Sequence, residues 1–136
     1  MVAVNRWINE LGVRVIVTNL GELHGAYLHD HHAILLDEEL APIQRRSTLM
    51  HELGHAYYGH PRSTTRTERE ASEWAARALI RPCEIWKLSR MYDDPQAIAH
   101  ELGVLPRDVV HFHEWFARVG EMTRKILPPF GAKEYN

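Results

Sequence analysis

His51-Glu52-Leu53-Gly54-His55 is a complete H-E-x-x-H pattern inside a segment whose residue spacing predicts a helix. One turn of α-helix takes 3.6 residues, so His51 and His55 project from the same face about 5–6 Å apart. Two imidazoles held in this way can fill two corners of a zinc tetrahedron. Glu52 is rotated by roughly 100° from His51, where its carboxylate can act as a general base without binding the metal. The motif therefore predicts a metal-dependent hydrolase.

The helix that carries the motif is predicted to start at Pro42 and to end near Gly59. Its front face holds Thr48 and the motif side chains, whereas its back is apolar. We expect such a helix to lie buried at the floor of a cleft. Gly54, between the two histidines, is where a larger side chain would crowd a neighbouring strand or helix.

A second helix, predicted over 67–80, carries three glutamates that compete for the role of third ligand. Glu68 falls on the small and apolar face of this helix, whereas Glu70 and Glu73 share the opposite face with Arg77. A lone inward carboxylate is costly to bury unless it is paired or binds a metal. We therefore predict Glu68 as the third ligand. The other two, on the solvent face, can pair with Arg77 or stay solvated. The alternative is that Glu68 is only a first-turn acid favoured by the helix dipole.

The segments before the motif predict a short helix over 2–11, a strand over 13–18, and a hairpin with arms at 25–29 and 33–36. Together these strands predict a small antiparallel sheet. Four histidines gather around the hairpin, and we favour a polar hairpin tip over a second metal site, because their spacing does not close a tetrahedron. They are His24, His29, His31 and His32.

The segments after the motif are predicted to be helical at 83–92, at 95–103 with Asp94 as its cap, and at 106–119. The last two have the rhythm of a helix-turn-helix. We favour packing over DNA reading, because Arg107 is followed by an acid rather than by residues suited to base edges. The residues expected to be buried in the last helix are Val109, Val110, Phe112, Trp115 and Phe116.

The 136 residues suit one domain, predicted over 1–120, followed by a tail at 121–136 whose order the sequence does not predict. A net charge of −2 with interleaved signs provides no basic field, so direct binding of nucleic acid is not expected. Cys83 is the lone cysteine, which excludes an internal disulfide and fits a reducing cytosol. We see no signal peptide and no membrane-length apolar run.

The segments RRSTLMHELGHAYYGH at 45–60 and EREASEWAA at 68–76 resemble the two motifs of the ImmA/IrrE family of metallopeptidases. The hairpin residues at 25–27 and 34–36 are also similar to that family. The resemblance extends over roughly 12–82 and is strongest toward the phage-encoded members. It is specific because two motifs occur in order at a suitable gap.

The resemblance implies a Zn²⁺ ion bound by His51, His55 and Glu68, with Glu52 as the catalytic base. The family often has Asp or Asn four residues after the ligand glutamate, orienting a ligand histidine, and here that position is Ser72. A serine can accept a hydrogen bond from an imidazole N–H, although without a charge. Family members commonly act on helix-turn-helix repressors, which implies a role in a phage or mobile-element immunity switch in the bacterial host cytosol.

We therefore expect an α+β, zincin-like minimal metallopeptidase domain, with the sheet packed on the H-E-x-x-H helix and a helical C-terminal half. The expected activity is peptide hydrolysis, with an edge strand of the hairpin holding the substrate. Tyr58 and His60 are both candidates for stabilising the oxyanion, and the sequence leaves the choice open. Two rivals remain: a catalytically idle zincin that binds a repressor, and a zinc hydrolase of small molecules.

Overall fold

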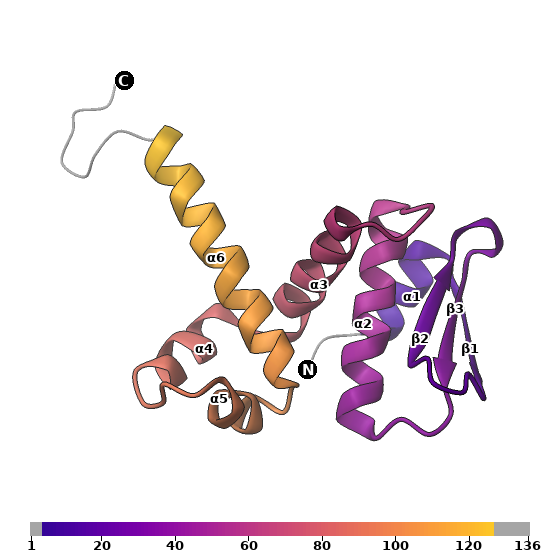
Figure 1. Cartoon of the computed structure of the whole chain (residues 1–136), viewed down its shortest axis with the longest axis horizontal. Helices are drawn as coiled ribbons and strands as arrows, with labels where there is room; N and C mark the ends of the chain where they lie inside the picture. Colours follow the sequence, from indigo (N-terminus) through magenta and orange to yellow (C-terminus); the bar gives the residue numbers. More distant parts are fainter. Residues whose placement is uncertain (1–3, 127–136) are drawn as a thin grey trace.

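The computed structural model of the chain describes residues 4–126. Within this range the fold is α+β, as predicted, with a small sheet at one end and helices over the rest (Figure 1). The elements, in chain order, are α1 (Val4–Leu11), β1 (Arg14–Thr18), β2 (Gly25–Leu28), the short 3₁₀ turn η1 (His29–His31), β3 (Ala33–Asp37), α2 (Pro42–Tyr58), α3 (Thr65–Leu79), α4 (Pro82–Ser89), α5 (Pro95–Leu102) and α6 (Pro106–Ile126).

The sheet has the strand order β1-β3-β2. The predicted hairpin is confirmed, since β2 and β3 pair in antiparallel fashion. The prediction of a wholly antiparallel sheet is wrong, because β1 pairs with β3 in parallel. β3 is the most buried strand and takes the centre, where apolar side chains are covered on both faces. β2 is consequently an edge strand, and it runs beside α2 (Figure 1).

The two helices α2 and α3 pack side by side next to the sheet (Figure 1). α2 begins at Pro42 and ends at Gly59, whose φ of 66° is the left-handed conformation that glycine tolerates. α3 begins after a Thr64–Thr67 capping box, in which each side chain bonds to the other residue's backbone N–H. The starts of both helices and the end of α2 therefore follow from local sequence signals.

The contact between α2 and α3 depends on Gly54. A Cβ atom at this position would lie 2.8 Å from the carbonyl oxygen of Ala71 and 2.9 Å from its Cα. Real Cβ atoms do not approach backbone this closely, so only glycine lets the two helices meet at this separation. The predicted reason for Gly54 is confirmed, and the neighbour it accommodates is α3.

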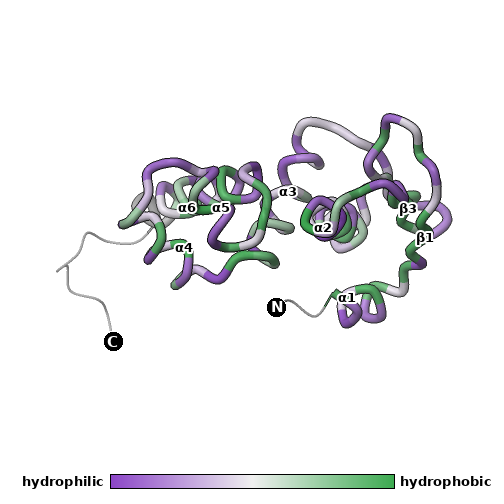
Figure 2. The backbone as a smooth tube through the Cα atoms, turned by 90° about the horizontal axis from the view of Figure 1, so that it is seen from below, coloured by the Kyte–Doolittle hydropathy of each residue, from purple (hydrophilic) through white to green (hydrophobic). Residues whose placement is uncertain are grey.

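Two apolar clusters form the core, and α3 contributes to both. One joins α1, the sheet, α2 and α3, and the other joins the end of α3 to α4, α5 and α6. Figure 2 shows these two ends of the molecule on either side of α3. The buried members of the first cluster are Val13, Ile34, Leu36, Met50, Leu53, Trp74 and Ala75. Those of the second are Ala76, Ile80, Ile85, Ile98, Ala99, Val104, Val109 and Phe112.

Helix α6 differs from its prediction in length and in its buried face. It continues beyond Val119 to Ile126, so the first part of the predicted tail at 121–136 is helical, and 127–136 lie outside the described residues. Val110 and Phe116, which were expected to be buried, are 39% and 48% exposed. The reason is that α6 packs through a narrow stripe centred on Val109 and Phe112, and neighbouring positions turn away from it.

Among the described helices, none has the length and apolarity to cross a membrane.

Candidate metal centre

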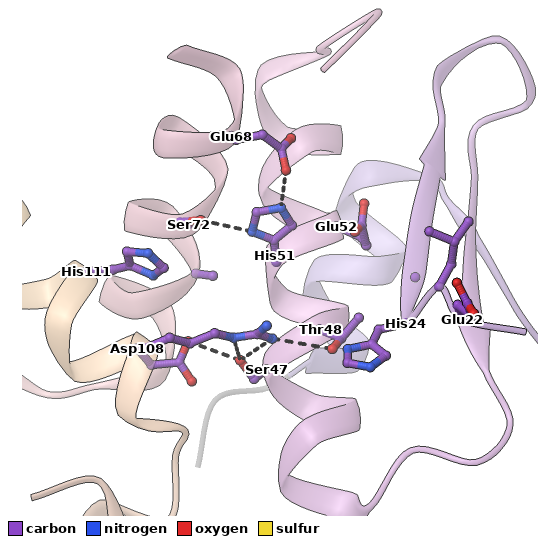
Figure 3. A pocket seen from close by; sticks show the side chains of 14 residues that line it. Glu22, His24, Ser47, Thr48, His51, Glu52, Glu68, Ser72, Asp108 and His111 are labelled. Atoms are coloured by element: carbon purple, nitrogen blue, oxygen red, sulfur yellow. Dashed lines mark hydrogen bonds and ion pairs between the residues drawn. The ribbon is translucent and has the colours of Figure 1, made fainter. Parts of the chain in front are cut away.

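The structure brings His51, His55 and Glu68 together between α2 and α3. Figure 3 shows two of them, His51 from α2 and Glu68 from α3, facing each other. The Nε2 atoms of the two histidines lie 3.2 Å apart. One carboxylate oxygen of Glu68 lies 3.1 Å from His51 Nε2, and the other lies 2.7 Å from His55 Nε2. Neighbouring ligands of a tetrahedral zinc with bonds of about 2.0–2.1 Å would lie roughly 3.3 Å apart, which is close to this arrangement.

The protonation of these three groups also suits a cation. Burial lowers the pKa of His51, and burial followed by the neighbouring His51 lowers the pKa of His55 to about 4. For Glu68, partial burial opposes ionisation, but the two histidines outweigh it and the pKa is lowered. At neutral pH the site therefore presents two imidazole lone pairs and a carboxylate to one point, as a divalent metal requires. The donor set fits the metal that the motif implies.

Each histidine uses its other ring nitrogen for a contact behind the site. His51 Nδ1 lies 3.2 Å from the hydroxyl oxygen of Ser72, the position at which the family resemblance implies a supporting residue. His55 Nδ1 lies 2.9 Å from His60 Nδ1. The two rings are consequently held from behind by different chemical groups.

Glu52 lies next to the three converging groups without joining them, on the side of α2 toward the sheet (Figure 3). It is 8% exposed. Burial, followed by repulsion from Glu68, raises the pKa of Glu52 to about 7, against the opposing effects of the Tyr27 backbone N–H and of Arg107. In the metal-free site Glu52 therefore holds a proton more readily than a solvated carboxyl does, and a positioned carboxyl of this kind can accept and return a proton.

Two cavities adjoin the site, and Glu52 and Glu68 line both of them. The cavity beside His51 has a volume of about 340 Å³, and the one beside His55 has a volume of about 260 Å³. The edge strand β2 borders both through Gly25. A Cβ atom there would lie 2.8 Å from the Thr48 side chain, so glycine lets β2 approach α2 beside Glu52. We refer to the two cavities and the bordering edge of β2 together as the groove.

The far wall of the larger cavity comes from α6, which the sequence did not connect with the site. Arg107 Nη2 donates to Ser47 Oγ at 3.1 Å, and Ser47 Oγ donates to the buried carboxylate of Asp108 at 3.0 Å. His111 follows Arg107 by one helical turn and lines the same cavity (Figure 3). In the sequence, the only indication of this role is the Arg-x-x-x-His spacing at the start of a helix. That these two side chains face α2 follows only from the fold.

The structure separates the two oxyanion candidates named from the sequence. Tyr58 borders neither cavity, and its ring stacks on that of His60. His60 borders the smaller cavity, but its ring nitrogens face His55 at 2.9 Å and Glu70 at 3.2 Å. Among the described residues, Arg107 and His111 are therefore better placed to meet a bound substrate on the His51 side.

The predicted solvent face is wrong for Glu73 and holds only in part for Glu70, whose side chain is 29% exposed. Glu73 is 4% exposed and forms an ion pair with Arg118 of α6, through both carboxylate oxygens. Glu70 contacts His60. Helical projection of α3 alone could not show this, because the partners come from α6 and from the end of α2.

The hairpin histidines lie apart from the three converging groups. His24 is exposed and lines the larger cavity (Figure 3). His29 Nδ1 lies 3.1 Å from the Tyr27 hydroxyl. His31 and His32 are exposed, and His32 adopts a left-handed conformation with φ of 46° at the turn.

Two histidines and a glutamate on adjacent helices, beside a buried glutamate outside the donor set, define a metallopeptidase-like domain. The chain belongs to the peptidase M78 family, whose IrrE N-terminal-like domain matches residues 8–111, and the predicted family is thereby confirmed. It is also similar to the radiation response metalloprotease IrrE of Deinococcus deserti, with 38% identity over 45 residues. That match covers 33% of this chain and 16% of the relative.

Proposed function

We propose that this chain is a zinc-dependent metallo-endopeptidase, with His51, His55 and Glu68 as the zinc ligands and Glu52 as the general base. The observation that carries the proposal is the convergence of two imidazole lone pairs and a carboxylate at one point. A second, buried carboxyl lies next to that point and does not contribute to it. A binding module would have no use for this second carboxyl.

The chemistry divides between the metal and the residues around it. Zinc, when bound, polarises a carbonyl and lowers the pKa of water toward 7. Glu52 takes a proton from the attacking water and returns it to the departing amine nitrogen. The backbone N–H of Tyr27 favours the ionised form of the Glu52 carboxyl. Burial keeps bulk water from competing for that proton.

The groove suits an extended peptide better than an enclosed small molecule. Its border, β2, is an edge strand whose backbone can pair with a substrate strand. Arg107 and His111 line the opposite wall of the larger cavity. We infer that they replace Tyr58 and His60 as the groups that stabilise negative charge on the carbonyl oxygen.

The proposed substrate is a helix-turn-helix repressor of a phage or mobile element, cleaved in the bacterial cytosol. Membership of the family supports a protein substrate. The groove also limits the conformation of the cleaved segment. An extended segment fits beside β2, whereas a folded helix must open locally before it can bind. The protein should therefore be a poor general protease.

The test compares a repressor encoded beside this chain with casein as an unstructured substrate. Zinc-loaded protein is incubated with each, the products are read by mass spectrometry, and Glu52→Gln serves as the blank. We expect cleavage of the repressor at one or a few sites and slow cleavage of casein. Rapid casein cleavage with an intact repressor would contradict the proposed substrate. Tight repressor binding by both proteins, with no cleavage, would favour the idle binding module instead.

A further inference from the structure

The end of α2 places a third histidine, His60, directly behind His55. Both residues are buried, at 8% and 7% exposure, and their Nδ1 atoms lie 2.9 Å apart. On a continued helix, residues five apart would diverge by roughly 140°. The left-handed Gly59 ends the helix, and the backbone N–H of His60 then donates to the carbonyl oxygen of His55. This reversal returns the His60 ring to His55, where the ring of Tyr58 stacks on it.

The protons of this pair can be assigned from the contacts. For His55 Nε2 to bind a metal, the single proton of the neutral ring must be on Nδ1. That N–H then donates to His60 Nδ1, so the proton of His60 must be on its Nε2. His60 Nε2 lies 3.2 Å from Glu70 Oε1, and an ionised carboxylate can only accept a hydrogen bond. The series from Glu70 through His60 to His55 therefore closes with every donor matched to an acceptor.

The other ligand histidine has a weaker arrangement behind it. His51 Nδ1 faces the hydroxyl of Ser72, which can donate or accept and so does not select one tautomer. Glu70 is 29% exposed at its side chain, and Arg66, 3.9 Å away, is largely in solvent. The carboxylate of Glu70 is thus available to His60 rather than neutralised by a buried cation.

We propose that His60 and Glu70 are positioning residues, which hold His55 in the tautomer that binds the metal. The inference rests on the proposed zinc site. In the family pattern, an Asp or Asn at the position of Ser72 orients a ligand histidine. In this chain the charged support would instead lie behind His55. Partners of this kind typically contribute 10- to 100-fold to metal affinity.

The test measures zinc affinity by competition with a chromophoric chelator, in the full chain. Glu70→Gln should weaken zinc binding about 10-fold and His60→Ala by about 10- to 100-fold, whereas Ser72→Ala should change it only a few-fold. The matched control is Glu101→Gln, which removes an exposed carboxylate from α5, at a distance from the site. It should bind zinc as the wild type does.

A second readout separates positioning from a structural role. In the zinc-loaded wild type, the Nδ1 proton of His55 should give a slowly exchanging, downfield NMR signal, and Glu70→Gln should move it. The unfolding free energy of the metal-free protein should be the same for Glu70→Gln and for Glu101→Gln. If His60→Ala and Glu70→Gln both bind zinc as tightly as the wild type, this inference is wrong and the proposed function still stands. The same holds if Glu70→Gln loses zinc affinity and unfolding free energy together, because its role would then be structural. A wild type that binds no zinc would overturn the proposed function as well.

Discussion

Replacing Glu52 by Gln should stabilise the metal-free protein at alkaline pH. Burial, followed by the charge of Glu68, raises the pKa of Glu52 from its ordinary 4.5 to about 7 in the folded state. A group whose folded pKa is raised contributes stability that is present at low pH and is lost as pH rises through that value. Each tenfold change in proton affinity corresponds to 1.36 kcal/mol, so the full cost of ionising Glu52 is about 3 kcal/mol.

The assay is urea unfolding of the chelator-treated proteins at pH 5 and pH 8, followed by tryptophan fluorescence. Wild type should lose about 2–3 kcal/mol relative to Glu52→Gln between these two values. Titration of the histidines is common to both proteins and cancels in the comparison. Glu101→Gln, which removes an exposed acid, should show no such difference. A constant difference between wild type and Glu52→Gln at both pH values would refute the reasoning, because Glu52 would then ionise in the fold as easily as in the unfolded chain.

Three further changes test the packing and the groove. Gly54→Ala should lower the unfolding free energy by about 2–3 kcal/mol in urea titration, because its Cβ would meet the backbone of Ala71, whereas Gly120→Ala on open α6 should not destabilise. Arg118→Ala should lower the unfolding free energy by about 2 kcal/mol, because it leaves the buried Glu73 carboxylate without its partner. Zinc affinity should be unchanged, because the pair lies away from the metal site. A measured change in unfolding free energy below about 0.5 kcal/mol would show that the pair contributes little. Arg107→Gln should lower kcat/KM for the cleaved substrate by about 10-fold or more with unchanged zinc content, and an unaltered kcat/KM would remove Arg107 from the proposed machinery.

Local geometry explains how much of this centre was visible in the sequence. The H-E-x-x-H spacing and the orientation of Glu68 toward α2 depend only on helical periodicity, which the structure keeps. The expected burial of Glu68 is wrong, because its side chain is 44% exposed and that of Glu70 only 29%. Helix starts at Pro42 and Pro95, and ends at Gly59 and Gly103, follow from residues whose backbone preferences act locally.

What the sequence could not show depends on contacts between distant segments. The central strand of the sheet is the one covered on both faces, and β3 occupies this position because it is the most apolar of the three strands. Glu73 looked solvated because its partner, Arg118, follows 45 residues later on another helix. Arg107 and His111 looked like ordinary helix residues until the packing of α6 on α3 placed them at the cavity.

The most direct test of the zinc site is anomalous X-ray scattering at the zinc edge from crystals of zinc-loaded Glu52→Gln. Our account predicts one strong peak, about 2.0–2.2 Å from His51 Nε2, His55 Nε2 and a carboxylate oxygen of Glu68. It also predicts that residue 52 stays outside the coordination sphere. A peak that lies on other side chains, or the loss of the metal in this variant alone, would contradict the assignment of the ligands and of the base.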